Sequence, residues 1–363
     1  MTRIAKVEAL PLRIPFTDGG SGQGLMPSRW THLDMALVRV ETDDGLVGWG
    51  EAFAYSCLSA TVAAIRDMVA PLVIGREIGD IAALNLEIQQ RLHLHGRYGI
   101  TIFALSGVDI ALWDIAARAK GVSLSALLGG RKRDAVPAYA SLVRYGDPAL
   151  VRRFAEQAAG AGYADVKLHE ITLPAIEAGR AAVGPDIRLT TDVNCNWSLA
   201  TAEEMLPHMK RLNLFWVEEP VFPPDDEATL GRLVTRFGVP IATGENACTA
   251  VEFARTIPHV TYPQPSVTKV GGVTEFLKVV DLAARHGKTP MPHSPYFGPG
   301  YWATLQIAAA RPACGLFEYL YITPESWLAG DMPVPAAGAI HVPDGPGLGC
   351  TPDPEVLARF RAD

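Results

Sequence analysis

The sequence contains few cysteines, and none of them are paired at a metal-binding or redox spacing. Five cysteines are scattered over 363 residues without a Cys-x-x-Cys pair. This pattern argues against a disulfide framework or a zinc knuckle. It favours a reducing, cytoplasmic location, where thiols remain reduced.

Signals for a membrane or a nucleic acid are also absent. The first residues show no apolar segment with a small-residue cleavage site, and no apolar run approaches the roughly 18–20 residues of a membrane span. Lys and Arg number 32 against 39 Asp and Glu, a formal net charge of −7, and no basic cluster stands out. We therefore expect neither a membrane nor a nucleic-acid partner.

The composition is that of an enzyme-sized globular protein, with 48% hydrophobic and 20% charged residues. The first part of the chain, residues 1–130, reads as strands followed by helices. A hairpin is expected at Asp43-Asp44-Gly45, and helices are expected over residues 59–70, 81–92 and 101–120. This order predicts a separate α+β domain.

From about residue 131 short apolar strands alternate with amphipathic helices, which predicts a closed parallel barrel over residues 131–322. The remaining residues, 323–363, are expected to run back over the first domain. The expected strands cover residues 135–141, 164–169, 187–193, 215–218, 241–244, 260–264, 289–293 and 316–319. The rival architecture is an open doubly wound sheet, but no glycine-rich turn with the full dinucleotide pattern opens a helix.

Three acidic residues stand at the ends of expected strands: Asp192, Glu218 and Glu245. They are 26 and 27 residues apart, which is one strand–helix unit each. Adjacent strands of a parallel barrel end at the same rim, so we expect the three carboxylates to converge. Such like charges repel unless a cation neutralises them, and oxygen ligands favour Mg²⁺, with Mn²⁺ as the alternative. A lone acid of this kind is more often an ordinary loop carboxylate.

Four further residues at strand ends are candidates for catalysis. Lys167 and His169 lie two apart and should share a face of the second strand, His293 ends the seventh, and Glu318 lies in the eighth. Groups on opposite sides of the ring suit proton removal on one side of a ligand and proton delivery on the other. The structural alternatives are ion pairing for Lys167 and Glu318 and core hydrogen bonding for the two histidines.

In this order and spacing the motifs resemble the enolase superfamily, and within it the mandelate racemase / muconate lactonizing enzyme family. The resemblance covers nearly the whole chain. It rests on Gly48-Trp49-Gly50-Glu51, residues 106–114, residues 127–130, Asp192-Val193-Asn194, Glu218-Glu219-Pro220, Gly244-Glu245-Asn246, Lys269-Val270-Gly271-Gly272 and residues 343–349.

The resemblance implies an N-terminal capping domain, a modified (β/α)₇β barrel, and Mg²⁺ on Asp192, Glu218 and Glu245. It also implies the first step, in which a base removes the α-proton of a carboxylate substrate and the metal stabilises the enediolate. Glu318 matches an acid that hydrogen-bonds the substrate carboxylate. A homo-oligomer is also implied, because family members commonly assemble through their capping domains.

The chain departs from the family pattern at two positions. The second strand carries Lys167-Leu168-His169 where Lys-x-Lys is usual, so either His169 or Lys167 is the base. Ser266 stands where the racemase-type subgroup has the Asp that orients its histidine. Lys269 is three residues further on, and this odd spacing predicts that its side chain faces away from the site. Without that partner His293 is better suited to act as an acid than as a second base, which favours dehydration of an acid sugar.

Two loops are expected to determine specificity, residues 18–30 and 51–56, with Arg29, Trp30, Tyr55 and Asn194 as candidate contacts of a small carboxylate substrate. Ordinary loop residues are the plainer interpretation of these four. Two other functions stay open. One is an isomerase of a carboxylate or lactone, that is, a cycloisomerase, racemase or epimerase. The other is a family member that binds metal and ligand without turnover.

Overall fold

The structure is a computed structural model that describes residues 2–20, 30–330 and 332–362. Its N-terminal part is an antiparallel sheet of β1, β2 and β3, with β11 added beside β1. The hairpin between β2 and β3 is confirmed, and Gly45 adopts a φ of +87°, which glycine tolerates best. The strands are β1 (Ile4–Thr17), β2 (His32–Thr42) and β3 (Val47–Ala52).

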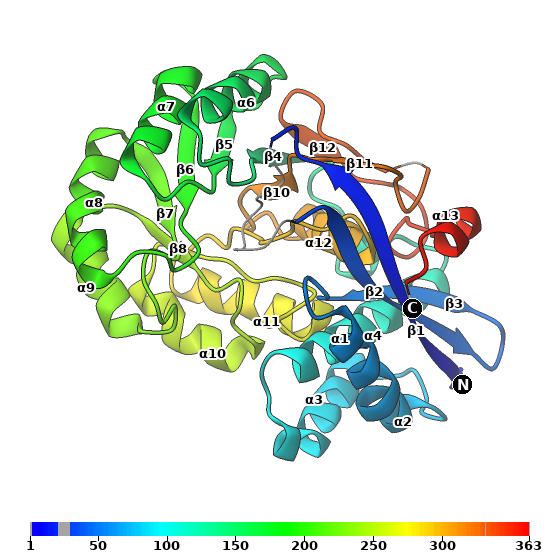
Figure 1. Ribbon diagram of the computed structural model, residues 1–363. Coiled ribbons are helices and arrows are strands. Elements are labelled where there is room, and N and C mark those ends of the chain that lie inside the picture. Colours follow the sequence, from blue (N-terminus) through cyan, green and yellow to red (C-terminus); the bar gives the residue numbers. More distant parts are fainter. Residues whose placement is uncertain (1, 21–29, 331, 363) are drawn as a thin grey trace.

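Helices cover one side of this sheet (Figure 1). The expected helix at residues 59–70 is divided by a π-helical turn, Ile65–Val69. The helices are α1 (Leu58–Ala64), α2 (Ala70–Val73), α3 (Ile81–Arg91), α4 (Ile100–Arg118) and α5 (Leu124–Leu127), with a 3₁₀ turn at His93–His95.

Helix α4 lies directly on β3, and the Gly-Trp-Gly motif makes this approach possible. A Cβ on Gly50 would come 1.9 Å from the carbonyl oxygen of Gly107, and one on Gly48 would come 2.4 Å from that of Ala111. We expected no segment long and apolar enough to span a membrane, but helix α4 meets both criteria. Ile100–Arg118 is long and apolar enough by composition, but 83% of its most apolar window is buried, as in a core helix.

The second sheet contains consecutive parallel strands in the order β10-β4-β5-β6-β7-β8-β9. The last strand thus lies beside the first, and the order does not reverse, so the doubly wound alternative is wrong. The architecture is an α/β, TIM-like fold with an added N-terminal part. The strands are β4 (Ala135–Ser141), β5 (Asp165–Leu168), β6 (Arg188–Asp192), β7 (Leu214–Glu218), β8 (Ile241–Thr243), β9 (Tyr262–Pro263) and β10 (Phe317–Leu320).

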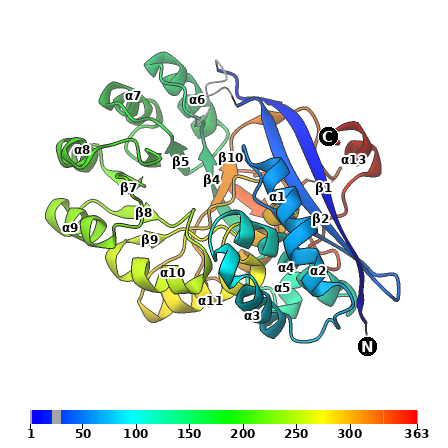
Figure 2. The ribbon, with the colours of Figure 1, turned by 60° about the horizontal axis from the view of Figure 1, so that its bottom comes forward.

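Helices lie outside these strands (Figure 2), and most of them are amphipathic, whereas every residue of the last one, α12, is buried. Helix α11, for example, buries Val273, Phe276 and Val280. The helices are α6 (Pro148–Gly160), α7 (Leu173–Val183), α8 (Leu199–Arg211), α9 (Glu227–Phe237), α10 (Thr249–Thr256), α11 (Gly272–Arg285) and α12 (Pro299–Ala310), with a 3₁₀ turn at Ile257–His259.

The expected seventh strand, residues 289–293, does not form a regular strand. Pro290 and Pro292 have no N–H group, so this segment cannot form the continuous backbone hydrogen bonds of a regular strand. It is nevertheless held in the gap between β9 and β10, because Met291 N donates to Pro263 O and Gly315 N donates to Pro290 O. His293 N donates in the same way to Pro265 O.

The last part of the chain contacts both sheets. Strand β11 pairs with β1, and Ala362 N donates to Pro11 O, while β12 pairs with β4. A single apolar core joins Leu12, Ile14 and Met35 of the N-terminal sheet to barrel residues such as Val166 and Phe317. The elements are β11 (Thr323–Pro324), β12 (Ala339–His341) and α13 (Pro354–Arg359).

Candidate active site

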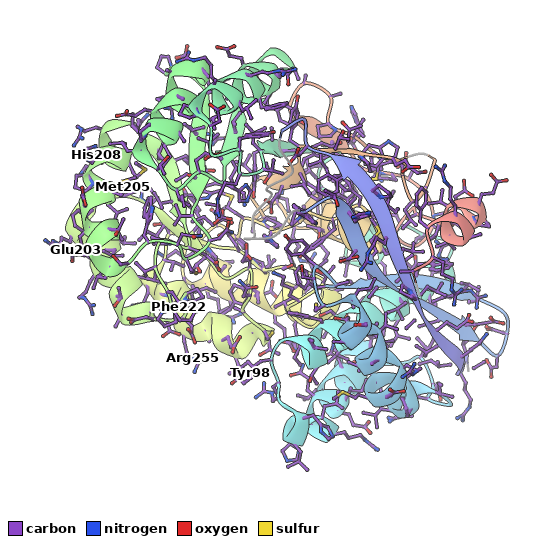
Figure 3. The ribbon with its side chains drawn as sticks, viewed as in Figure 1. Tyr98, Glu203, Met205, His208, Phe222 and Arg255 are labelled. Atoms are coloured by element: carbon purple, nitrogen blue, oxygen red, sulfur yellow. The ribbon has the colours of Figure 1, made fainter. Side chains whose placement is uncertain are left out.

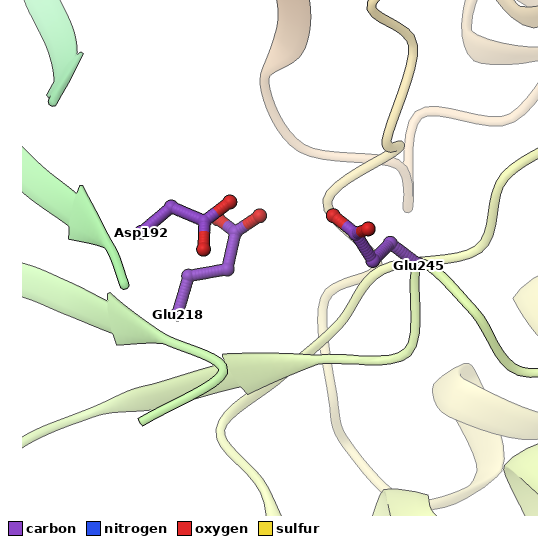
Figure 4. Close-up of side chains that lie close together, drawn as sticks. All are labelled: Asp192, Glu218 and Glu245. Carbon is purple, nitrogen blue, oxygen red and sulfur yellow. The ribbon is translucent and has the colours of Figure 1, made fainter. Parts of the chain in front are cut away.

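The three acidic residues converge as expected. Asp192 ends β6 and is in register with Glu218, which ends β7, while Glu245 lies just beyond β8. One oxygen from each lies within 4.8 Å of the others, and the side chains point toward one another (Figure 4). Asp192 and Glu218 are buried and Glu245 is partly so.

The electrostatics of these carboxylates fit a cation. Burial and the nearby charge of Asp192 raise the pKa of Glu218 well above its usual value. Burial also raises the pKa of Asp192, but the charges of Lys167 and His169 outweigh this effect and bring it to about 2. A set of three carboxylates, of which Glu218 is costly to ionise without more positive charge nearby, matches what Mg²⁺ requires.

Lys167 lies at the centre of the carboxylates, on β5. Its Nζ is 2.8 Å from Glu318 Oε1, 2.9 Å from Glu218 Oε1 and 3.5 Å from Asp192 Oδ2. Burial lowers the pKa of Lys167, but Glu218 and Glu318 outweigh this effect and raise it well above its usual value. The ammonium group is therefore tied into three ion pairs.

His169 follows β5 and approaches Asp192, one of the three carboxylates that Lys167 contacts, as the two-residue spacing predicts. Its Nε2 is 3.4 Å from Asp192 Oδ2, and its Nδ1 is 2.5 Å from the carbonyl oxygen of Leu142. His169 therefore approaches the carboxylates with one ring nitrogen and contacts the backbone with the other.

His293 approaches the carboxylates from the segment between β9 and β10. Its Nε2 is 3.1 Å from Glu245 Oε2. The orienting Asp is missing, as Ser266 predicts, and Nδ1 instead lies 3.2 Å from Tyr296 Oη and 3.3 Å from Ser266 Oγ. These partners are hydroxyl groups rather than the carboxylate of the family pattern, and the nearness of Tyr296 in sequence, three residues from His293, was the signal that could have indicated them.

Glu318 on β10 is held from three directions. It pairs with Lys167 and accepts hydrogen bonds from Ser141 Oγ at 2.8 Å and from Ser294 N at 3.1 Å. These contacts fix the orientation of its carboxylate at the wall of the cavity.

Lys269 also reaches the carboxylates, although its odd offset from Ser266 predicted that it faces elsewhere. Its Nζ is 3.5 Å from Glu245 Oε1 and 4.1 Å from the centre of the Phe53 ring. The expectation is wrong because the chain leaves the strand after Pro263 and turns, so a two-residue period no longer applies.

Two other polar residues of the site were also missed. Glu219 is buried beside the carboxylates, where burial and the charge of Glu245 raise its pKa well above the usual value. Arg144 donates to the carbonyl oxygen of His169 at 2.6 Å and to Asn194 Oδ1 at 2.9 Å. The Glu218-Glu219 pair is a signal in the sequence, whereas nothing in the pattern around Arg144 indicates these contacts.

One cavity of about 490 Å³ lies between the barrel and the N-terminal sheet, and the polar residues that line it include His169, Asp192, Glu219, Glu245, Lys269, His293 and Glu318. Trp30, Tyr55 and Asn194 are on its wall, and Trp30 and Tyr55 pack edge to face with their ring centres 4.7 Å apart. Arg29 lies outside the described residues. Phe222, which is labelled in Figure 3, is 78% exposed and is one of the residues that line the cavity.

Comparison with known proteins gives two family matches along the chain. Residues 28–129 match the N-terminal domain of mandelate racemase / muconate lactonizing enzyme, and residues 150–356 match the enolase C-terminal domain-like family.

Curated relatives and solved structures agree with these matches. The chain is 33% identical to D-galactarolactone cycloisomerase of Agrobacterium fabrum, over 92% of this chain and 93% of that protein. It is 30% identical to arabinonate dehydratase of Saccharolobus solfataricus, over 91% of each. A racemase from Streptomyces coelicolor with bound magnesium superposes with a TM-score of 0.87 at 26% identity, covering 99% of this chain and 100% of that one.

Proposed function

Because the chain belongs to the mandelate racemase / muconate lactonizing enzyme family of the enolase superfamily, we propose that it is a Mg²⁺-dependent acid-sugar dehydratase. The observation that carries this proposal is the arrangement of the cavity. His169 and His293 approach one group of carboxylates from different elements, so a substrate held there has a proton-transfer group on either side.

In this proposal Asp192, Glu218 and Glu245 hold the metal, with Mn²⁺ as the alternative ion. When bound, the cation supplies the positive charge that stabilises the enediolate formed from the substrate carboxylate. Glu318 and Asn194 orient the carboxylate end of the substrate, and Trp30 and Tyr55 contact the rest of it. Arg29 stays a prediction from the sequence.

His169 is the proposed base, because Lys167 is already held by three carboxylates. His169 removes the α-proton, and the electron pair of that C–H bond forms the enediolate. His293 then donates a proton to the hydroxyl group on the neighbouring carbon, and the C–O bond breaks to release water. The resulting enol tautomerises to a 2-keto-3-deoxy acid, so atoms and electrons balance without an oxidant or a second substrate.

The same proposal includes the organisation of the chain. Residues 1–130 form a capping domain, residues 131–322 a (β/α)₇β barrel, and residues 323–363 a segment that returns to the capping domain. The contacts of β11 with β1 and of Ala362 with Pro11 support the return. A cytoplasmic homo-oligomer is the expected state.

The test is a screen of acid sugars with Mg²⁺ in deuterated water, followed by proton NMR and a keto-acid assay. We expect a 2-keto-3-deoxy product from at least one acid sugar, and its loss after chelation of the metal and in Asp192→Asn. Glu177→Gln, an exposed substitution on α7, is the matched control. Deuterium exchange at the α-carbon without any keto acid would contradict dehydration.

A cycloisomerase is the second candidate, favoured by the 33% identity to D-galactarolactone cycloisomerase. If the leaving oxygen belongs to a ring, its elimination keeps every atom in the product. Mass spectrometry separates the two reactions, because dehydration lowers the mass by one water whereas cycloisomerisation leaves it unchanged.

A further inference from the structure

Glu51 ends the Gly-Trp-Gly-Glu motif, and the contact of α4 with β3 explains the two glycines but not this acid. The side chain of Glu51 is buried, and it lines the cavity of the site. No lysine, arginine or histidine among the described residues pairs with its carboxyl group. Burying a carboxyl group without a cation costs free energy, so an apolar side chain would make the fold more stable here. A carboxyl group that is kept in a cleft at such a cost is a candidate for a functional role.

The two carboxyl oxygens of Glu51 have different surroundings. Oε2 accepts a hydrogen bond of 2.9 Å from Gly300 N, in the first turn of α12. A Cβ at Gly298 or Gly300 would come 2.6 or 3.0 Å from this oxygen, so the two glycines leave the room that the carboxyl group needs. Oε1 has no hydrogen-bond partner among the described residues, and it is not enclosed by protein atoms. Oε2 therefore fixes the carboxyl group against α12, and Oε1 is left for a ligand in the cavity.

The part of the cavity wall that the N-terminal sheet and its following loop contribute has no basic residue among the described ones. It consists of Trp30, Leu33, Asp34, Met35, Glu51, Phe53, Ala54, Tyr55 and Ser56. Asp34 is already paired with Arg13 at 2.8 Å, so Glu51 is the unpaired acid of this wall. The basic side chains of the cavity belong to the barrel: His169, Lys269 and His293. A ligand whose reacting carboxylate lies at the barrel therefore meets, at its other end, a wall that suits neutral groups and opposes a second negative charge.

A hydroxyl group matches Oε1 of Glu51 because it can both donate and accept a hydrogen bond. It accepts from Oε1 when the carboxyl group is protonated, and it donates to Oε1 when the group is ionised. A carboxylate only accepts, so it fits the protonated form alone and is repelled by the ionised form. We propose that Glu51 is a specificity-determining residue that binds a hydroxyl group of the substrate through Oε1 and thereby selects acids with one carboxylate and a neutral polar end. This inference deepens the proposed function and rests on it for the identity of the substrate as an acid sugar.

Titration calorimetry of the Mg²⁺-loaded protein with two pairs of acid sugars tests the proposal. D-Gluconate and D-glucarate form one pair, and D-galactonate and galactarate form the other. The members of a pair differ only in having a hydroxymethyl group or a second carboxylate at C6. The titrations are run at pH 8, above the value of about 7 to which burial raises the pKa of Glu51. We expect the monocarboxylate of at least one pair to bind about 10-fold or more tightly than its partner.

Substitutions at Glu51 separate the contact of Oε1 from the packing of the wall. Glu51→Met removes both oxygens and should weaken binding of the preferred monocarboxylate roughly 3–10-fold, while the preference over the dicarboxylate shrinks. Glu51→Gln keeps one donor and one acceptor group and should retain the monocarboxylate affinity within about twofold. Thr304→Val is the matched control, because Thr304 Oγ1 donates to Gly300 O at 2.8 Å and does not line the cavity. On an acid that the protein dehydrates, Glu51→Met should raise KM by the same factor and change kcat about twofold or less.

The proposal is overturned if each dicarboxylate binds as tightly as its monocarboxylate partner, if Glu51→Met binds every acid as the unmodified protein does, or if none of the four acids binds. An equal weakening in Thr304→Val also overturns it, because the start of α12 rather than Oε1 would then carry the effect. Binding requires no turnover, so a preference for the monocarboxylate without any keto-acid product refutes the proposed dehydration alone. Dehydration of both members of each pair at similar kcat/KM refutes this inference alone.

Discussion

The carboxyl group of Glu51 provides a stability prediction with a definite sign. Glu51 is on β3 and is only 4% exposed, and its Oε2 accepts a hydrogen bond from Gly300 N at 2.9 Å. No cation among the described residues pairs with it. Burial raises the pKa of this carboxyl from 4.5 to about 7.

The linkage between protonation and folding gives the sign and the size of the contribution of Glu51 to the free energy of unfolding. A carboxyl whose pKa is raised in the folded chain stabilises the fold at low pH, fully below the unfolded value, and this contribution is lost as the pH rises through about 7. Between pH 5 and pH 8 the loss from Glu51 is roughly 2.5 kcal/mol for values of 4.5 and about 7. For a chain of 363 residues this corresponds to roughly 3 °C in Tm, at about 2.1 cal/mol/K of unfolding entropy per residue.

Glu51→Gln should remove this pH dependence, because glutamine stays neutral at both pH values. Differential scanning calorimetry at pH 5 and pH 8, with ionic strength and Mg²⁺ constant, compares the variant with the unmodified protein and with Glu177→Gln. The Tm of the unmodified protein should fall by roughly 3 °C more than that of Glu51→Gln. Asp109, whose pKa burial also raises to about 7, is present in all three proteins and cancels. Equal falls in Tm would refute the reasoning.

Three further predictions concern the cavity. Asp192→Asn should weaken Mg²⁺ binding by at least about 100-fold, because even residues that only hydrogen-bond to metal ligands contribute about 10–100-fold to metal affinity. An unchanged Mg²⁺ affinity in titration calorimetry would remove Asp192 from the site. Lys167→Met should destabilise the metal-free protein by about 3–5 kcal/mol in urea unfolding, because it leaves Glu218 and Glu318 without their buried partner; a loss below about 1 kcal/mol would contradict this. His293→Asn should lower kcat by about 10²–10⁴-fold and leave Mg²⁺ affinity nearly unchanged; full activity would remove His293 from the mechanism.

The periodic features of the sequence predicted the parts of the site that lie on regular strands. Asp192 and Glu218 are at strand ends, one strand–helix unit apart, and the expectation that they converge with Glu245 is confirmed by oxygens within 4.8 Å of one another. Lys167 and His169 both approach Asp192 because side chains alternate along a strand. The role of the three carboxylates as metal ligands stays a prediction.

Irregular backbone accounts for most of the failures. Residues 289–293 do not form a strand because two prolines in this segment lack a backbone N–H donor. Lys269 lies beyond the end of β9, where the chain turns, and so reaches Glu245 although its offset indicated otherwise. Neither outcome follows from counting residues, since the period of the backbone changes within this segment.

The sequence by itself determined the alternation of strands and helices, the positions of the acidic residues and the family, because each depends on local periodicity or on residue order. Only the tertiary structure decided which groups touch. The contacts of His293 with Ser266 and Tyr296, and of His169 with the carbonyl of Leu142, depend on distances between segments. A one-dimensional pattern carries no information about such distances.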